Sequence, residues 1–135
     1  GLNNINTIKG FDINTIPQEI SYLSHFDANS SEEATKTFVE NYKAKFNGET
    51  PSQFAAAAYD CVYALYEALN AAGESKVSAS MSAEEFCRVL KEQFDGSFTY
   101  SGVTGSNMKW TRGTSGAGYV EKTATKFVVK EADNA

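Results

Sequence analysis

Chemically reactive side chains are scarce in this sequence. It has a single histidine, His25, and two cysteines, and these residues do not recur at the spacing of a metal-ligand motif. A Ser-His-Asp or Cys-His catalytic device would have to use His25, around which no nucleophile motif is found. The scarcity therefore argues against an enzyme and indicates neither a metal ion nor another cofactor.

Two further absences restrict the class of partner. The twelve Lys and Arg residues are scattered and the net charge is −5, so no basic stripe could follow a phosphate backbone, and nucleic acid is disfavoured as a partner. No apolar run approaches the length of a membrane span. A content of 41% hydrophobic and 21% charged residues in a chain of 135 is typical of one soluble globular domain.

The two cysteines, Cys61 and Cys87, leave two interpretations open. Each lies in an expected helix beside apolar neighbours, which favours buried free thiols that act as small hydrophobic side chains. A disulfide that joins the two helices is the alternative if the protein works outside the cytoplasm. A catalytic thiol is disfavoured because no base is placed to activate it.

Residues 51–60 form the most informative run of the chain. Ser52 can cap a helix by accepting a backbone N–H, and Phe54 is followed by four alanines. Because alanine has almost no side-chain bulk, another backbone or a ligand can come close to such a helix. The run is therefore typical either of a capped core helix or of an aromatic wall at a helix N-terminus.

Hydrophobic periodicity and capping signals predict three helices, over residues 30–46, 52–72 and 82–94. The first and the third each open with a capping box, Ser30 with Glu33 and Ser82 with Glu85. Apolar side chains occupy more than half of the circumference of the second helix, which predicts a central, well-covered element. One inward face of that helix is expected to consist of Ala58, Val62, Leu65 and Leu69.

Short strands are expected before and after the helices, over residues 20–26, 97–101, 108–111 and 126–130. Residues 102–105, Gly-Val-Thr-Gly, lack the lysine of a phosphate loop and are better explained as a tight turn between two strands. Residues 111–118 are rich in Gly, Ser and Thr and are expected to be a turn region. The pattern predicts an α/β fold, three helices with short β-strands at the N-terminal and C-terminal ends.

Several segments, taken in order, resemble the type I periplasmic binding proteins. The closest branch is that of the branched-chain amino-acid ABC transporter solute-binding proteins, similar to the Leu/Ile/Val-binding protein. The matching segments are residues 19–22, 38–46, 51–60, 67–73 and 102–105, followed by Trp110. Each motif alone is weak, but their common order over most of residues 15–130 makes the resemblance fairly specific.

The resemblance implies that this chain corresponds to the C-terminal portion of such a protein only, because family members are more than twice as long and have two α/β lobes. It implies a partial lobe in which residues 1–27 form the end of the C-terminal lobe and the crossover. Residues 28–135 would then be part of the N-terminal lobe plus the final hinge strands, in one compact unit. The first residue is Gly rather than Met, which agrees with a processed or shortened protein.

The resemblance also implies a function. Members of the family are extracytoplasmic, in the periplasm or as cell-surface lipoproteins, and they capture a small amino acid between two lobes for the permease subunits of an ABC importer. Phe54 matches the family position whose ring covers the ligand, and its neighbour Gln53 could donate a hydrogen bond. His25, Phe26 and Asp27 match the crossover between lobes, which implies a hinge.

Two other interpretations remain open, a ligand-sensing domain of a receptor with the same fold and an unrelated helical interaction module. Thr111 and Arg112 stand where the family usually has an acidic residue, which loosens the match of the final strands. Since most polar ligand groups of the family would lie outside this chain, we expect weak amino-acid binding by the chain alone. Unpaired strand edges predict self-association of the fragment.

Overall fold

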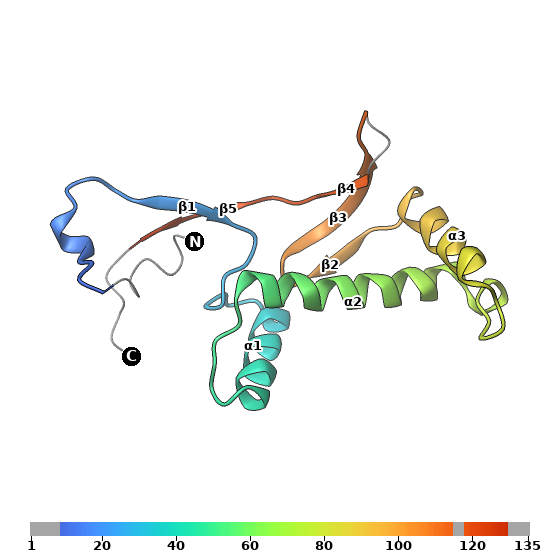
Figure 1. Cartoon of the computed structure of the whole chain (residues 1–135), viewed down its shortest axis with the longest axis horizontal. Coiled ribbons are helices and arrows are strands. Elements are labelled where there is room, and N and C mark those ends of the chain that lie inside the picture. Colours follow the sequence, from blue (N-terminus) through green and yellow to red (C-terminus); the bar gives the residue numbers. More distant parts are fainter. Residues whose placement is uncertain (1–8, 115–117, 130–135) are drawn as a thin grey trace. The chain divides into compact units, whose positions relative to one another are not determined.

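The computed structural model describes residues 9–114 and 118–129 (Figure 1). This part of the chain forms three α-helices and five short strands in two small sheets, the mixed α/β fold that the sequence predicts. In chain order the elements are η2 Ile13–Thr15, β1 Ser21–Ser24, α1 Glu33–Lys45, α2 Gln53–Ala72, η3 Glu74–Lys76, α3 Ala83–Phe94, β2 Tyr100–Gly102, β3 Gly105–Arg112, β4 Gly118–Glu121 and β5 Thr125–Val128.

Side-chain caps fix the start of two helices as predicted. At the start of α2, Ser52 Oγ accepts the Ala55 N–H at 3.3 Å. At the start of α3 both halves of the capping box form. Ser82 Oγ accepts the Glu85 N–H at 3.2 Å, and Glu85 Oε2 accepts the Ser82 N–H at 2.9 Å.

The capping box predicted for α1 is wrong. The N-cap of α1 is Glu32, whose side chain makes no capping hydrogen bond. Ser30 Oγ accepts the Glu32 N–H at 3.2 Å, and the Ser30 N–H donates to the Asp27 carbonyl at 3.2 Å. Ser30 therefore belongs to the turn that leads into α1, because its short side chain bonds to the backbone two residues ahead and not to the third helical residue.

All strand pairs are antiparallel, but only the pairs among β2, β3 and β4 are local in sequence. β1 and β5 form a two-stranded antiparallel ladder in which Tyr22 is paired with Phe127, and their rings stack with centroids 5.5 Å apart. β2, β3 and β4 form an antiparallel sheet in that order, and the turn at residues 103–104 joins β2 to β3 as expected. The turn region expected over residues 111–118 is too long, since β3 extends to Arg112 and β4 begins at Gly118.

The chain divides into two compact units. The first comprises Gly1–Ser24 and Ala124–Ala135, and its described elements are η2 and the β1–β5 ladder. The second is the continuous segment His25–Thr123, with the three α-helices and the β2–β3–β4 sheet. The chain thus passes between the units twice, whereas the assignment of residues 1–27 and 28–135 to lobes of a larger protein stays a prediction.

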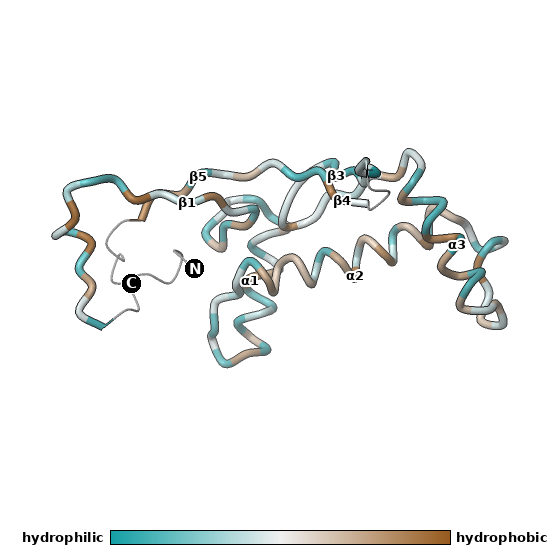
Figure 2. Tube along the Cα trace, turned by 45° about the horizontal axis from the view of Figure 1, so that its top comes forward, coloured by the Kyte–Doolittle hydropathy of each residue, from teal (hydrophilic) through white to brown (hydrophobic). Residues whose placement is uncertain are grey.

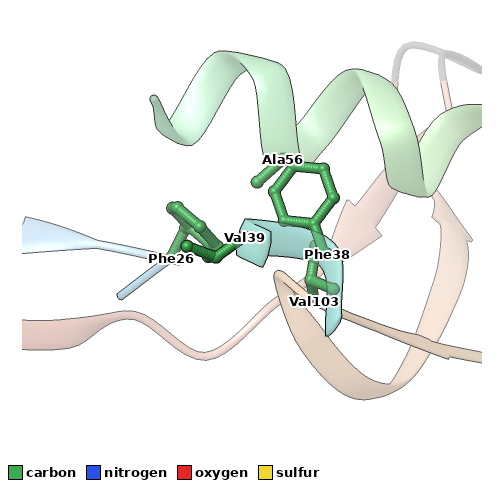
Figure 3. Close-up of a cluster of buried hydrophobic side chains, with 5 residues drawn as sticks. All are labelled: Phe26, Phe38, Val39, Ala56 and Val103. Atoms are coloured by element: carbon green, nitrogen blue, oxygen red, sulfur yellow. The ribbon is translucent and has the colours of Figure 1, made fainter. Parts of the chain in front are cut away.

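The core of the second unit is small and draws on four parts of the chain. Its buried side chains are Phe26, Phe38, Val39, Ala56 and Val103 (Figure 3). The Phe26 and Phe38 rings meet edge to face with centroids 5.8 Å apart. Ala56 is fully buried, so the alanine run allows close packing against α2, as one of the two interpretations of that run requires.

The orientation of α2 differs from the one predicted. Its buried residues recur every four positions, at Ala56, Asp60, Ala64 and Ala68. The face expected to point inward points outward, with Val62 65% exposed. Figure 2 shows apolar residues along much of α2. The prediction failed because both sides of this helix are apolar, and the close packing of neighbouring elements selects the side with the small alanines.

Candidate functional site

The start of α2 carries the two residues implied to contact a solute. Phe54 is the second residue of the helix and its ring is 75% exposed, while Gln53 is half-buried beside it. The first backbone N–H groups of a helix have no partner within the helix, and the helix dipole makes that end favourable for an anion. Such an end can bind two parts of one solute: the exposed ring can contact an aliphatic side chain, and the N–H groups can bind a carboxylate. The ligand-wall role of both residues stays a prediction.

The three expected hinge residues lie at the first passage between the units. His25 is exposed, and its Nδ1–H donates to the Thr123 carbonyl oxygen at 3.2 Å. Phe26 belongs to the core, and Asp27 Oδ1 accepts the Asn29 N–H at 2.9 Å in a turn. Because His25 begins the second unit and Thr123 ends it, this bond ties the two passages together. A hinge motion of these residues stays a prediction.

The most densely bonded side chain in the described part is the carboxylate of Asp60, which is 2% exposed. Its Oδ1 accepts the Val103 N–H at 2.9 Å. Its Oδ2 accepts the Thr104 N–H at 2.8 Å and the Thr104 hydroxyl at 2.5 Å. Hydrogen bonds to a charged acceptor are roughly twice as strong as neutral ones, so this carboxylate fixes the position of the β2–β3 turn against α2.

Three neighbours complete the surroundings of Asp60. Lys122 Nζ donates to Thr104 Oγ1 at 2.6 Å. The Thr104 hydroxyl therefore bridges the positive charge of Lys122 and the carboxylate of Asp60. The Tyr100 hydroxyl lies 3.5 Å from Asp60 Oδ1, and burial, reinforced by the negative charge of Asp60, raises the pKa of Tyr100. A Cβ atom on Gly102 would lie 2.2 Å from Asp60 Oδ1, so the turn requires glycine there.

Asp60 is a structural residue that sequence patterns alone leave without a role. Two signals could have revealed it. Asp60 occupies the same four-residue row as Ala56, Ala64 and Ala68, so it is a charged residue on an otherwise small and apolar helix face. The turn at residues 102–105 offers successive backbone N–H groups that need an acceptor once they are buried. A buried carboxylate provides the acceptors that the N–H groups of such a turn need, and the turn provides the donors that the carboxylate needs.

The arrangement around Asp60 is structural in character. Its oxygens accept hydrogen bonds from Val103 and Thr104 in one turn and, at 3.5 Å, from the Tyr100 hydroxyl, so they hold neighbouring parts of the fold and not a reacting group. A cavity of about 100 Å³ lies beside it between α2 and the strands, with Cys61 and Trp110 among its lining residues. Because small-molecule sites are usually about 300–1,000 Å³, this cavity is too small to enclose an amino acid.

Both cysteines are free and exposed, so the expectation that Cys61 and Cys87 are buried is wrong. A disulfide between them stays a prediction. Within residues 9–114 and 118–129, no three His, Cys, Asp or Glu side chains are grouped so that they could hold a metal ion. No helix in this part of the chain has the length and apolar character needed to cross a bilayer.

At the surface, Asp95 joins α3 to β3. It accepts hydrogen bonds from Arg112, with Nη2 2.7 Å from Oδ2, and from Lys91 one helical turn earlier. The guanidinium of Arg112, followed by the ammonium of Lys91, lowers the pKa of the Asp95 carboxyl to about 2. All three side chains are exposed, so water and salt screen this cluster.

No family model matches the sequence, and a search of curated proteins finds no match. Among solved structures, the chain is similar to a protein from Rhodospirillum rubrum described as a branched-chain amino acid ABC transporter. The two are 26% identical with a TM-score of 0.58, over 84% of this chain and 29% of the other. This chain thus spans less than a third of that protein's length, and over most of its own length it is similar in fold and sequence to part of a branched-chain amino acid ABC transporter.

Proposed function

We propose that this chain is part of an extracytoplasmic solute-binding protein of an ABC importer and supplies one wall of a cleft for a small amino acid of the branched-chain type. The likeness to the R. rubrum protein over 84% of the chain is the observation that carries the proposal. Within the whole protein, the partners are the amino acid and the permease subunits of the importer. The solute-loaded form is the one that the permease recognises.

Phe54 is the apolar contact of this wall. Its ring is 75% exposed, so an aliphatic side chain that lies against it removes apolar surface from water. Covering an aromatic ring of roughly 200 Å² on one face stabilises the contact by about 1–3 kcal/mol. A dissociation constant of 1 mM already requires about 4 kcal/mol. One wall alone therefore binds an amino acid only weakly.

The polar contacts come from the same end of α2. The backbone N–H groups that start the helix can bind the α-carboxylate of an amino acid, as helix N-termini bind anions in many proteins. The carboxamide of Gln53 carries two N–H donors that can reach a bound solute. Ser52 fixes the position of this end, because its hydroxyl caps the helix.

A titration of the chain with leucine, followed by amide chemical shifts in NMR, tests the proposal. We expect shift changes at residues 52–55 with a dissociation constant of about 1 mM or weaker. Glutamate at equal concentration should cause smaller changes, because a second carboxylate gains nothing from an aromatic wall. Phe54→Ala should weaken the leucine response at least about threefold, as the loss of part of a 1–3 kcal/mol contact requires.

Tyr119→Ala is the matched control. It also removes an exposed aromatic ring, but from β4, and should leave the leucine titration unchanged. Leucine shifts that are equal in the Phe54→Ala chain, or that fall away from the start of α2, would contradict the assignment of this wall.

A further inference from the structure

Asn47 and Gly48 directly follow the last turn of α1, and together they form the one Asn-Gly dipeptide of the sequence. Such a pair is chemically labile, because the backbone nitrogen of the residue after an asparagine can attack the side-chain carboxamide of that asparagine. Glycine hinders this attack least, since it has no Cβ and leaves the backbone free to move. The pair is therefore a place where the chain can change its own covalent structure.

The two residues belong to the motif that ends α1. Asn47 has a φ of 52° and Gly48 a φ of 86°, so both lie in the left-handed region. The Gly48 N–H donates to the Lys43 carbonyl at 2.8 Å. This six-residue bond defines a Schellman motif, in which asparagine is a common alternative to glycine at the left-handed position.

The reacting atoms are open to water. Every residue from 43 to 50 is exposed. A Cβ on Gly48 would meet no atom within 4 Å, so the space beside its nitrogen is free. In the part of the chain that the structure describes, the Asn47 carboxamide has no hydrogen-bond partner that would hold it away from the backbone.

A single hydrogen bond protects the nitrogen in the folded chain. The Gly48 nitrogen must lose its proton before it can attack, and that N–H is bonded to the Lys43 carbonyl. The end of an exposed helix frays readily, so this bond opens without unfolding of the core. Because one hydrogen bond shifts an equilibrium by about fivefold, the fold slows the attack by about that factor and does not prevent it.

We propose that Asn47 is a site of spontaneous deamidation in the folded chain, with aspartate and isoaspartate as the products. The Gly48 nitrogen forms a bond to Asn47 Cγ, the Cγ–Nδ2 bond breaks, and ammonia leaves with the proton of the Gly48 amide. Water then opens the cyclic imide. Cleavage of the nitrogen–Cγ bond gives aspartate, whereas cleavage of the bond to the main-chain carbonyl carbon gives isoaspartate, in which the backbone runs through the former side chain.

The chain contains a second dipeptide that could form the same imide, and its surroundings disfavour the reaction. Asp95 precedes Gly96, the one Asp-Gly pair of the sequence. Its side chain is an ionised carboxylate in salt bridges with Lys91 and Arg112. An ionised carboxylate is a poor electrophile, and the ion pairs hold it away from the Gly96 nitrogen. The neutral carboxamide of Asn47 has neither obstacle, so we expect modification at residue 47 and not at residue 95.

Deamidation changes the end of α1 in two ways. Both products place a carboxylate beside the C-terminus of the helix, where the helix dipole disfavours negative charge. Isoaspartate also adds one backbone atom before Gly48, which disrupts the Schellman hydrogen bond to Lys43. The reaction uses no atom of Gln53 or Phe54, so it can hold or fail independently of the proposed solute contact.

Incubation of the full chain at pH 8 for several days, followed by mass spectrometry of tryptic peptides, tests the proposal. Trypsin cuts after Lys45 and Lys76, so Asn47 and Asn70 lie in one peptide. At Asn47 we expect the mass gain of an amide converted to an acid, increasing with time, and methylation of the product by an isoaspartyl methyltransferase. Asn70 is exposed but lies within α2 before an alanine, so it controls for exposure and should stay unchanged.

Asn47→Gly is the matched variant, because glycine adopts the left-handed conformation without strain and keeps the end of α1. It should show no mass gain in this peptide. Incubation of the unchanged chain in guanidinium chloride should speed the reaction about fivefold, since the Gly48–Lys43 bond is then lost.

Four results would each overturn the proposal. They are a folded chain that stays unmodified while the unfolded chain reacts, an equal mass gain at Asn70, a gain that persists in Asn47→Gly, and methylation at residue 95 equal to that at residue 47. A reaction that is no faster in guanidinium chloride would overturn the protective role of the Gly48–Lys43 bond.

Discussion

At the scale of single residues, one carboxylate joins two parts of the fold that are distant in sequence. Asp60 accepts the hydrogen bonds of the Val103 and Thr104 N–H groups, which are buried away from water and would otherwise have no acceptor. Gly102 makes room for it, since any Cβ there would meet Asp60 Oδ1. The β2–β3 turn and the middle of α2 are therefore specified together, by residues more than 40 positions apart.

Asp60→Ala is expected to lower the free energy of unfolding by about 3 kcal/mol, because it removes hydrogen bonds to a charged group and leaves two buried N–H groups without an acceptor. Urea unfolding followed by circular dichroism measures this loss.

Glu67→Ala is the control for that change. It removes a carboxylate from the same side of the same helix, but an exposed one, and should change stability by no more than about 0.5 kcal/mol. If Asp60→Ala costs no more than Glu67→Ala, the carboxylate does not hold the turn.

At the scale of elements, the helices differ in how far the sequence determines them. The bounds of α2 and α3 follow from local chemistry, because Ser52 and Ser82 each meet a backbone N–H within their own first turn. The orientation of α2 does not, since apolar residues occur all round it and only contacts distant in sequence decide which side is buried. β4 is not predicted from the sequence, because the segment that leads into it is rich in Gly, Ser and Thr and is typical of a turn.

The contact between α3 and β3 should respond to acid through Asp95. Its pKa is lowered from 3.8 to about 2, so the ionised form stabilises the fold. This contribution is complete above about pH 4 and is lost as the pH falls towards 2, because the unfolded chain takes up the proton first. We expect the urea midpoints of the unchanged chain and of Asp95→Asn to differ at pH 6 and to converge near pH 2.

Glu40→Gln removes a carboxylate from the exposed side of α1 and serves as the control for charge alone. Its urea midpoint should keep the acid-dependent fall of the unchanged chain. A constant difference between Asp95→Asn and the unchanged chain from pH 6 to pH 2 would show that the pairing with Arg112 and Lys91 does not contribute.

At the scale of the whole molecule, the two units should differ in stability. The described part of the first unit is held by one two-stranded ladder, and such ladders are marginal in water. The second unit has a buried core and the Asp60 hydrogen bonds. The amide of Val129, which donates to the Ile20 carbonyl at 2.8 Å, should therefore exchange with solvent about tenfold or more faster than the amide of Val103.

Hydrogen exchange measured by NMR at neutral pH resolves these two amides. The amide of Ala56, bonded to the Ser52 carbonyl in the first turn of α2, is an internal reference for the second unit. Equal protection of Val129 and Val103 would mean that the two units open together.

The sequence reveals the class of fold and its helices, but only part of the candidate site. Ser52 is visible because a helix cap depends on neighbours in the chain, whereas Phe54 is singled out as a site residue only through the family resemblance. The hydrogen bonds of Asp60 and the outward position of Val62 depend on the β2–β3 turn, which lies more than 40 residues further along. Sequence patterns show which faces of a helix are apolar, and they do not show which face a distant turn will cover.

The bond between His25 and Thr123 has a consequence for how the gene can be cut. The second unit is one uninterrupted stretch of chain, and its two ends meet at a distance of 3.2 Å. Such a segment can be excised as a single coding block, inserted into a surface loop of another protein, or closed into a ring by a linker of a few residues. The first unit offers no such freedom, because its two strands are encoded at opposite ends of the chain and a truncation at either end removes half of its ladder.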